Sequence, residues 1–205
     1  MNRVDSSWAE SDSSSWLPTE AQRRQSLLRL RFRPVPVVAK PVLEVVDVFR
    51  AMLVNGGAHV AAFDVTDSDE VAAWFIRRNR AEYGLADQLI RSAAFAEAMP
   101  AVTSLGFVGT AGFERSRSLL LDGELACSLQ WGGAYTHPDL PGAQAKALGS
   151  AFCDSLFGDR YDDVDVDYSS ARWSHWFKGV AWDSTWVITD KRHRHLTVLC
   201  ITDVD

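Results

Sequence analysis

The residues in this sequence best suited to chemistry are a short run of aspartates near the C-terminal end. They are Asp162, Asp163, Asp165 and Asp167. Because strand side chains alternate between two faces, Asp163, Asp165 and Asp167 are expected to share one face. Carboxylates on one face can bind a divalent cation or attract a basic partner. The run lacks the glycine turn and final glutamate of a calcium loop, so a solvated acidic face is the simplest interpretation.

The histidines and cysteines give weaker signals for a metal or catalytic centre. His193 and His195 have the spacing that puts both imidazoles on one strand face, where zinc can bind. Basic neighbours on both sides favour a solvated hairpin tip instead. The cysteines are odd in number, widely spaced and set among small or apolar residues, which is typical of buried thiols: Cys127, Cys153 and Cys200.

Familiar catalytic and phosphate-binding motifs are missing from the sequence. There is no Gly-x-Ser-x-Gly elbow to support a serine hydrolase. Gly106, Gly109 and Gly112 follow an expected helix and precede an expected strand, the reverse of the order that points backbone amides at phosphate. A flexible loop is therefore expected at these glycines.

Tryptophan is concentrated in residues 173–186, which hold half of the eight tryptophans of the chain. Core packing is one interpretation, since Trp182 and Trp186 share a face if they lie on a strand. A recognition surface is the other interpretation, because tryptophan anchors protein interfaces beyond its share of area. The residues expected to anchor a partner are Trp173, Trp176 and Trp182.

Length and composition predict one globular domain. The chain has 205 residues, of which 47% are hydrophobic and 23% charged, enough for a single core. We expect a loosely ordered tail over residues 1–18 and one domain over residues 19–205. No apolar run reaches the roughly 18 residues that span a bilayer, and the N-terminus lacks the pattern of a secretory signal. A cytoplasmic protein without membrane contact is therefore expected.

Charge is distributed unevenly along the chain. Residues 51–205 contain 13 basic and 21 acidic side chains, a net charge of −8, whereas residues 1–50 carry a net charge of +2. An acidic body repels phosphate backbones, which disfavours nucleic-acid binding. A basic protein partner is favoured instead.

Apolar periodicity predicts mainly helices in the first half of the chain. Thr19 and Gln22 have the spacing of a capping box for a first helix. Alternating residues then indicate a strand that the following prolines confine to a sheet edge. The expected helices cover residues 20–26, 42–54, 68–83 and 86–98, and the expected strands cover residues 28–33 and 60–65.

The second half of the chain shows mostly strand periodicity. Asp122-Gly123, a dipeptide favoured in type I′ turns, predicts a hairpin of residues 119–121 and 125–131. A helix is expected between Pro141 and Gly158, followed by a strand over 161–168. The last hairpin pairs residues 185–189 with 196–202. Early helices and late hairpins predict an α+β fold, with an antiparallel sheet and helices packed mainly on one face.

The segment from Trp173 to the end of the chain resembles the C-terminal sheet of small bacterial immunity proteins that neutralise polymorphic toxins. The resemblance lies in the tryptophan-rich stretch, the closing hairpin of residues 185–189 and 196–203, and the Thr202-Asp203 ending. It implies a cytoplasmic, non-catalytic inhibitor that binds a toxin domain and blocks its active site. Acidic residues often make that contact when the toxin is a basic nuclease.

We therefore expect a binding protein without a cofactor. The four aspartates would steer a basic protein partner, and the three tryptophans would anchor it. The rival hypothesis is a small metal-dependent hydrolase that uses the aspartates with His175 or His137. A homodimer built through a sheet edge or the tryptophan patch is a third possibility.

Overall fold

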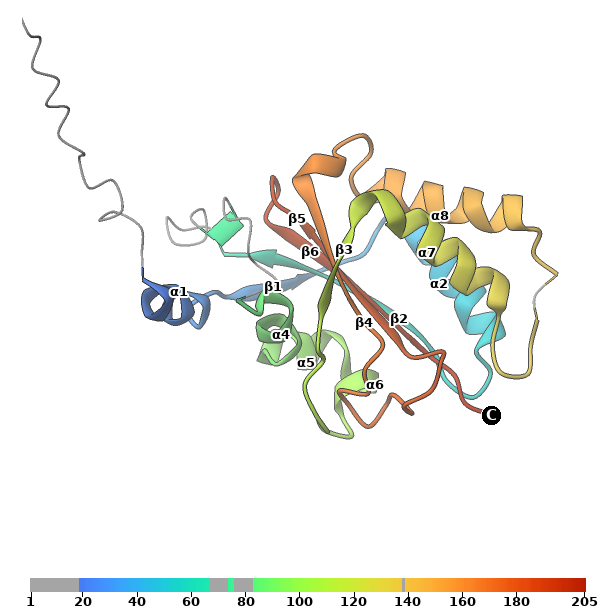
Figure 1. The fold of residues 1–205 in the computed structure, drawn as a ribbon, viewed down its shortest axis with the longest axis horizontal. Coiled ribbons are helices and arrows are strands. Elements are labelled where there is room, and N and C mark those ends of the chain that lie inside the picture. Colours follow the sequence, from blue (N-terminus) through green and yellow to red (C-terminus); the bar gives the residue numbers. More distant parts are fainter. Residues whose placement is uncertain (1–18, 67–73, 76–82, 138) are drawn as a thin grey trace, which may run out of the picture.

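A computed structural model describes residues 19–66, 74–75, 83–137 and 139–205. In these residues six strands form one fully antiparallel sheet in the order β1-β2-β6-β5-β4-β3 (Figure 1). The strands are β1 (Phe32–Val35), β2 (Gly57–Val65), β3 (Glu114–Arg117), β4 (Val164–Ser169), β5 (Ser184–Asp190) and β6 (His195–Thr202). The predicted α+β fold with an antiparallel sheet is confirmed.

The described helices cover both faces of the sheet (Figure 1). They are α1 (Glu20–Leu27), α2 (Lys40–Met52), α4 (Leu85–Ile90), α5 (Ala93–Ala98), α6 (Pro100–Thr103), α7 (Ser118–Trp131) and α8 (Gly142–Leu156), with a 3₁₀ turn, η1 (Tyr161–Asp163). The three longest, α2, α7 and α8, pack on one face, called here the α8 face. The short helices α4, α5 and α6 pack on the other, the α5 face. In the described part of the chain, no helix combines the length and apolar content required to cross a membrane.

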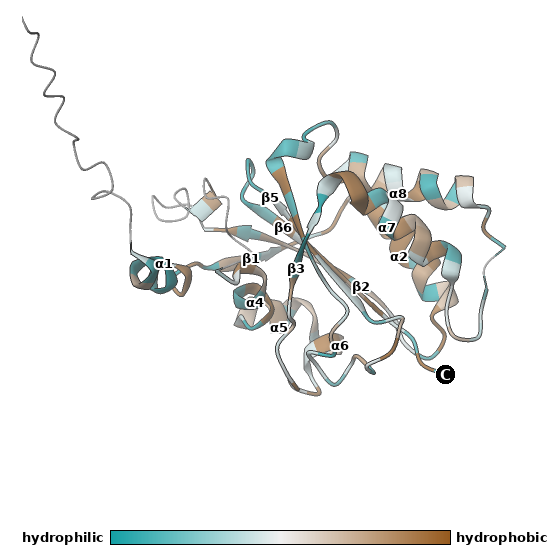
Figure 2. Ribbon diagram, in the orientation of Figure 1, coloured by the Kyte–Doolittle hydropathy of each residue, from teal (hydrophilic) through white to brown (hydrophobic). Residues whose placement is uncertain are grey.

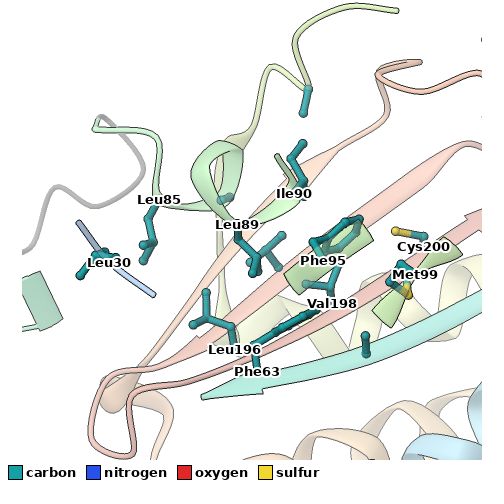
Figure 3. Packing of buried hydrophobic residues seen from close by; sticks show 14 of the residues in the cluster. Leu30, Phe63, Leu85, Leu89, Ile90, Phe95, Met99, Leu196, Val198 and Cys200 are labelled. Atoms are coloured by element: carbon teal, nitrogen blue, oxygen red, sulfur yellow. The ribbon is translucent and has the colours of Figure 1, made fainter. Parts of the chain in front are cut away.

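The central strands are buried on both sides because their side chains alternate between two cores. On β6, Leu196 and Val198 join the core of the α5 face, whereas Leu199 and Ile201 join that of the α8 face. Figure 3 shows the first of these cores, where residues from β2 and β6 face residues from α4 and α5. Strands buried on both faces read as nearly continuous apolar runs, which is why the last hairpin could be predicted.

Several local predictions are confirmed. The backbone N–H of Gln22 donates to Thr19 Oγ1 at 3.2 Å, and the N–H of Thr19 donates to Gln22 Oε1 at 2.8 Å, completing the capping box of α1. Pro34 lies in β1, which is an edge strand as proline requires. That strand begins at Phe32, however, four residues later than predicted, because a turn follows α1.

Two of the helices predicted in the first half of the chain are not described as single helices in the structure. The helix expected over residues 86–98 is two helices, because the Ser92 side chain accepts from the N–H of Phe95 and starts α5 separately from α4. The helix expected over residues 68–83 lies almost wholly outside the described residues.

The predicted hairpin around Asp122-Gly123 is wrong, because residues 118–131 form the continuous helix α7. Leu121, Leu125 and Leu129 recur every four residues and bury one helical face, a spacing that the shorter alternation obscured. The dipeptide serves helix packing instead. The Asp122 carboxylate forms an ion pair with Lys146 at 2.7 Å, and a Cβ atom at Gly149 would overlap the Asp122 carbonyl oxygen.

The close contact between α7 and α8 gives a stability test. We expect Gly149→Ala to lower the free energy of unfolding by about 1–3 kcal/mol, because the added methyl must push the Asp122 backbone away. Gly123→Ala is the matched control. Its Cβ would meet only the flexible Lys146 Nζ, at 3.6 Å, and alanine should raise helix stability by roughly 0.5–1 kcal/mol. Urea unfolding of both variants measures this; destabilisation by Gly123→Ala and not by Gly149→Ala would contradict the helical packing.

Candidate functional site

The four aspartates do not form one exposed face. Asp162 and Asp163 lie in η1, and Asp165 and Asp167 lie on β4 with their side chains on the α5 face of the sheet. Asp165 is ion-paired with Arg115 at 3.2 Å and with Lys191 at 3.5 Å. Asp167 is only 3% exposed. Burial closes Asp167 to a partner, so its predicted docking role is wrong, whereas Asp165 is half-buried with its charge paired inside the sheet and its docking role stays a prediction.

The three tryptophans expected to anchor a partner are also separated by burial. Trp173 is fully buried, donates its indole N–H to Thr185 Oγ1 at 3.0 Å and packs against Phe177. It is a core residue, so its predicted role as a surface anchor is wrong. Trp176 and Trp182 are half-buried.

A buried carboxylate that sequence reasoning missed orders this tryptophan-rich segment. Asp183 accepts hydrogen bonds from the backbone N–H groups of Lys178, Gly179 and Val180, and its other oxygen accepts from the Thr202 hydroxyl. Because the carboxylate is inaccessible and accepts all of these bonds, it acts as a structural anchor. Its position immediately before a wholly buried strand was the available sequence signal.

Asp203, also missed, fixes the end of the chain in the same way. One carboxylate oxygen accepts from the N–H of Asn55 at 2.9 Å, and the other accepts from the N–H of Ala134 at 2.8 Å. These bonds tie the last strand to the turn after α2 and to the loop after α7. The Thr202-Asp203 ending therefore holds three segments together.

The two histidines considered as zinc ligands lie against different carboxylates. His193 Nδ1 lies 2.9 Å from Asp190, and His195 Nδ1 lies 2.9 Å from Asp64. Burial would raise the pKa of Asp190, but hydrogen bonds from His193 and Arg160 outweigh it and lower that pKa. The hydrogen bond from His195 lowers the pKa of Asp64. Each histidine therefore has its own carboxylate partner, and the two imidazoles do not share a site.

The residues of the rival hydrolase hypothesis do not converge. His137 Nδ1 lies 3.3 Å from the Trp131 carbonyl oxygen, and His175 Nδ1 lies 3.5 Å from Arg172. Among the residues that the structure describes, no three histidine, cysteine, aspartate or glutamate side chains are grouped so as to hold a metal ion.

An exposed apolar surface with no partner in the described part of the chain lies on α7. Its outward side carries Leu119, Leu120 and Trp131, which are 66%, 54% and 72% exposed, and Tyr135 just beyond is 64% exposed. With the exposed Cys127 these residues are called the α7 outer face. Figure 2 shows the first turn of this helix as strongly hydrophobic.

Both charged side chains of α7 are used within the molecule. Asp122 pairs with Lys146 on α8. Glu124 accepts from the Trp186 indole N–H at 3.0 Å and from the Ser116 hydroxyl at 2.6 Å. The solvent-facing side of a helix normally carries charged residues. The α7 outer face instead has the apolar composition of a side that packs against another protein surface.

Acidic residues lie beside the N-terminal end of the α7 outer face. The Ser118 hydroxyl donates to the Tyr161 carbonyl at 2.8 Å and joins α7 to η1. Asp159, Asp162 and Asp163, called the acidic turn, surround that junction in sequence, and the first two are exposed. Arg160 between them turns inward to Asp190, at 2.7 Å, while Arg117 is an exposed cation at the start of α7.

Comparison with known proteins adds no assignment to this geometry. No protein-family model matches the chain, and no curated protein matches it. The functional conclusion therefore comes from the side chains described above.

His59 on β2 gives a pH test of the half-buried tryptophan region. Its ring meets that of Trp176 edge to face at 5.4 Å, and burial, with a smaller effect of Arg50, lowers its pKa from 6.5. Between the lowered pKa and 6.5 the folded protein binds fewer protons than the unfolded chain, so stability falls as pH decreases through this window.

We expect His59→Gln to remove this contribution, so that the variant loses less stability than the wild type between about pH 8 and pH 5.5. Urea unfolding at both pH values measures the difference. Equal m-values for the two proteins at about pH 8 are the control for an intact fold. If the variant and the wild type lose the same stability, the histidine is not responsible.

Proposed function

We propose that this chain is a non-catalytic protein-binding module of the immunity type, which docks a basic protein domain on the α7 outer face and the adjoining acidic turn. The observation that carries the proposal is a surface helix whose outward side bears large apolar side chains and no free charge. Burying such a side against a partner is favourable by about 25 cal/mol for each Å² of apolar area removed from water.

A protein partner fits this surface better than a small ligand. The apolar side chains of the α7 outer face are spread over several turns, from Leu119 in the first turn of a 14-residue helix to Trp131 at its end, and Tyr135 is exposed in the loop that follows. Protein interfaces of this kind have an aromatic anchor within an apolar core. Trp131 is that anchor, because it is the most exposed of the large residues on α7.

Charge favours a basic partner. The acidic turn lies at one end of the apolar face, and residues 51–205 carry a net charge of −8. Opposite charge around an apolar core speeds association and selects partners more than it adds affinity. Asp162 and Asp163 keep the steering role predicted for them, whereas the anchoring role passes from the tryptophans of residues 173–182 to Trp131.

The resemblance of the C-terminal segment to immunity proteins supports the same proposal. Strands β5 and β6 supply the closing hairpin on which that resemblance rests. A cytoplasmic inhibitor that occupies the active site of a basic toxin domain needs a surface of this composition and no chemistry of its own. The partner proposed is therefore a basic toxin domain encoded beside this chain.

The test is to express the product of the neighbouring gene and measure its affinity for this chain by calorimetry, together with rescue of growth in cells that produce it. We expect Trp131→Ala to weaken binding by at least about 30-fold, the effect of losing an aromatic anchor. Leu120→Asp should weaken binding further, because it places an uncompensated charge in the apolar contact. Both variants should fail to rescue growth.

Leu28→Asp is the matched control, since Leu28 is 63% exposed at the end of α1, which precedes the edge strand β1, whereas α7 follows β3 at the other edge of the sheet. It should bind and rescue as the wild type does, and exposed substitutions of this kind should change stability by no more than about 0.5 kcal/mol. Binding that survives both α7 substitutions would overturn the proposal. So would a homodimer of the free chain that Leu120→Asp dissociates, because a second copy would then cover the face.

A further inference from the structure

Two loops on the α5 face of the molecule meet and form a positively charged surface, although the chain as a whole is acidic. The first, residues 104–112, follows α6, and the second, residues 170–182, joins β4 to β5. Figure 1 shows them side by side below the sheet. Together with Arg91 they are called the two-loop surface. We propose that it docks an acidic protein segment that also carries apolar side chains.

Backbone hydrogen bonds make the two loops one surface. The N–H of Val108 donates to the Trp173 carbonyl at 3.0 Å, and the N–H of His175 donates to the Gly106 carbonyl at 3.0 Å. Phe107 and Ser174 form an antiparallel bridge between these bonds. Because Trp173 is buried in the core and Asp183 anchors the second loop, the surface is held in place before any partner binds.

Apolar side chains stand out from the first loop. Leu105, Phe107 and Val108 are 61%, 39% and 42% exposed. They lie within four residues of one another and form a second group of exposed large hydrophobic side chains on the molecule, separated from the α7 outer face by the sheet. A contiguous exposed apolar group is typical of a binding site.

The charges that surround these apolar residues are positive. Residues 104–112 and 170–182 contain no aspartate or glutamate, and the second loop contributes Arg172 and Lys178, both exposed. Arg91, which follows α4 directly, adds a third cation and donates to the Gly109 carbonyl at 2.9 Å. Asp87 offsets part of its charge and also accepts from the Ala111 backbone. An acidic segment is therefore attracted here although the chain as a whole is acidic.

The packing of Phe107 argues for an acidic protein segment over a single-stranded nucleic acid. Nucleic-acid surfaces combine cations with aromatic faces on which bases stack. One face of the Phe107 ring stacks on Trp173, with centroids 5.8 Å apart, and the Arg91 guanidinium lies 5.4 Å from the ring centroid. The Phe107 ring is therefore already engaged by Trp173 and Arg91, and it offers a partner an apolar edge more than a face on which a base could stack.

The inference does not rest on the proposed function, because the α7 outer face lies on the opposite side of the sheet. The test uses the full chain and fluorescence anisotropy with a labelled peptide rich in aspartate and glutamate with interspersed leucines. We expect saturable binding that weakens as salt is added. Arg172→Glu combined with Lys178→Glu should weaken it by at least about tenfold, and Leu105→Ser by about fivefold.

Lys40→Glu combined with Arg192→Glu is the matched control, because it makes the same change in net charge at exposed sites on α2 and on the β5–β6 turn. This control should reduce binding by less than about twofold. Equal losses in the two double variants would overturn the proposal, since binding would then follow only net charge. The proposal would also fail if the peptide did not bind, or if single-stranded DNA of equal charge bound more tightly. If the Arg172→Glu, Lys178→Glu variant still binds the basic partner of the α7 outer face with wild-type affinity, the two surfaces bind independently.

Discussion

The rest of this structure depends on the burial of the β5–β6 hairpin on both of its faces. Every residue of β5 is buried, and β6 is buried from Leu196 onward. Burying a polar side chain in a sheet enclosed in this way costs free energy unless the side chain has a hydrogen-bond partner or pairs with a charge. Asp183, Asp190 and Asp203 meet that requirement at the ends of the two strands, where they bind backbone amides of the adjoining loops. The hairpin thus organises loops as well as helices.

The same constraint decides where a partner can bind. With helices on both faces, the sheet presents only its two edge strands, and these carry features that discourage pairing: Pro34 in β1 and the charged residues Glu114, Arg115 and Arg117 in β3. Binding surfaces must therefore come from the outward sides of the covering elements. The α7 outer face and the two-loop surface are two such places, and their positions on opposite sides of the sheet follow from the architecture.

The parts of the fold that could be predicted are those fixed by neighbours in sequence. The capping box of α1 needs only Thr19 and Gln22, and the last hairpin needs only two apolar strands around a polar turn. The hairpin predicted in place of α7 was wrong because Asp122-Gly123 forms a turn only where the tertiary contacts of the chain allow one. The close contact of Asp122 with Gly149, 27 positions away in the sequence, belongs to a helix instead. The leucine spacing of four was present, but the shorter alternation matched it equally well.

The candidate site was predicted less well than the fold for a related reason. Alternation places Asp165 and Asp167 on one side of β4, but it does not say whether that side faces water. The answer depends on β3, whose Arg115 reaches Asp165, and on Lys191 at the end of β5. In the same way, the tryptophan count cannot tell Trp173, which the core encloses, from Trp131, which is exposed at the end of α7. Burial is a property of the assembled layers, so an aromatic or acidic residue becomes a binding residue only after the sheet order has decided which sides remain open.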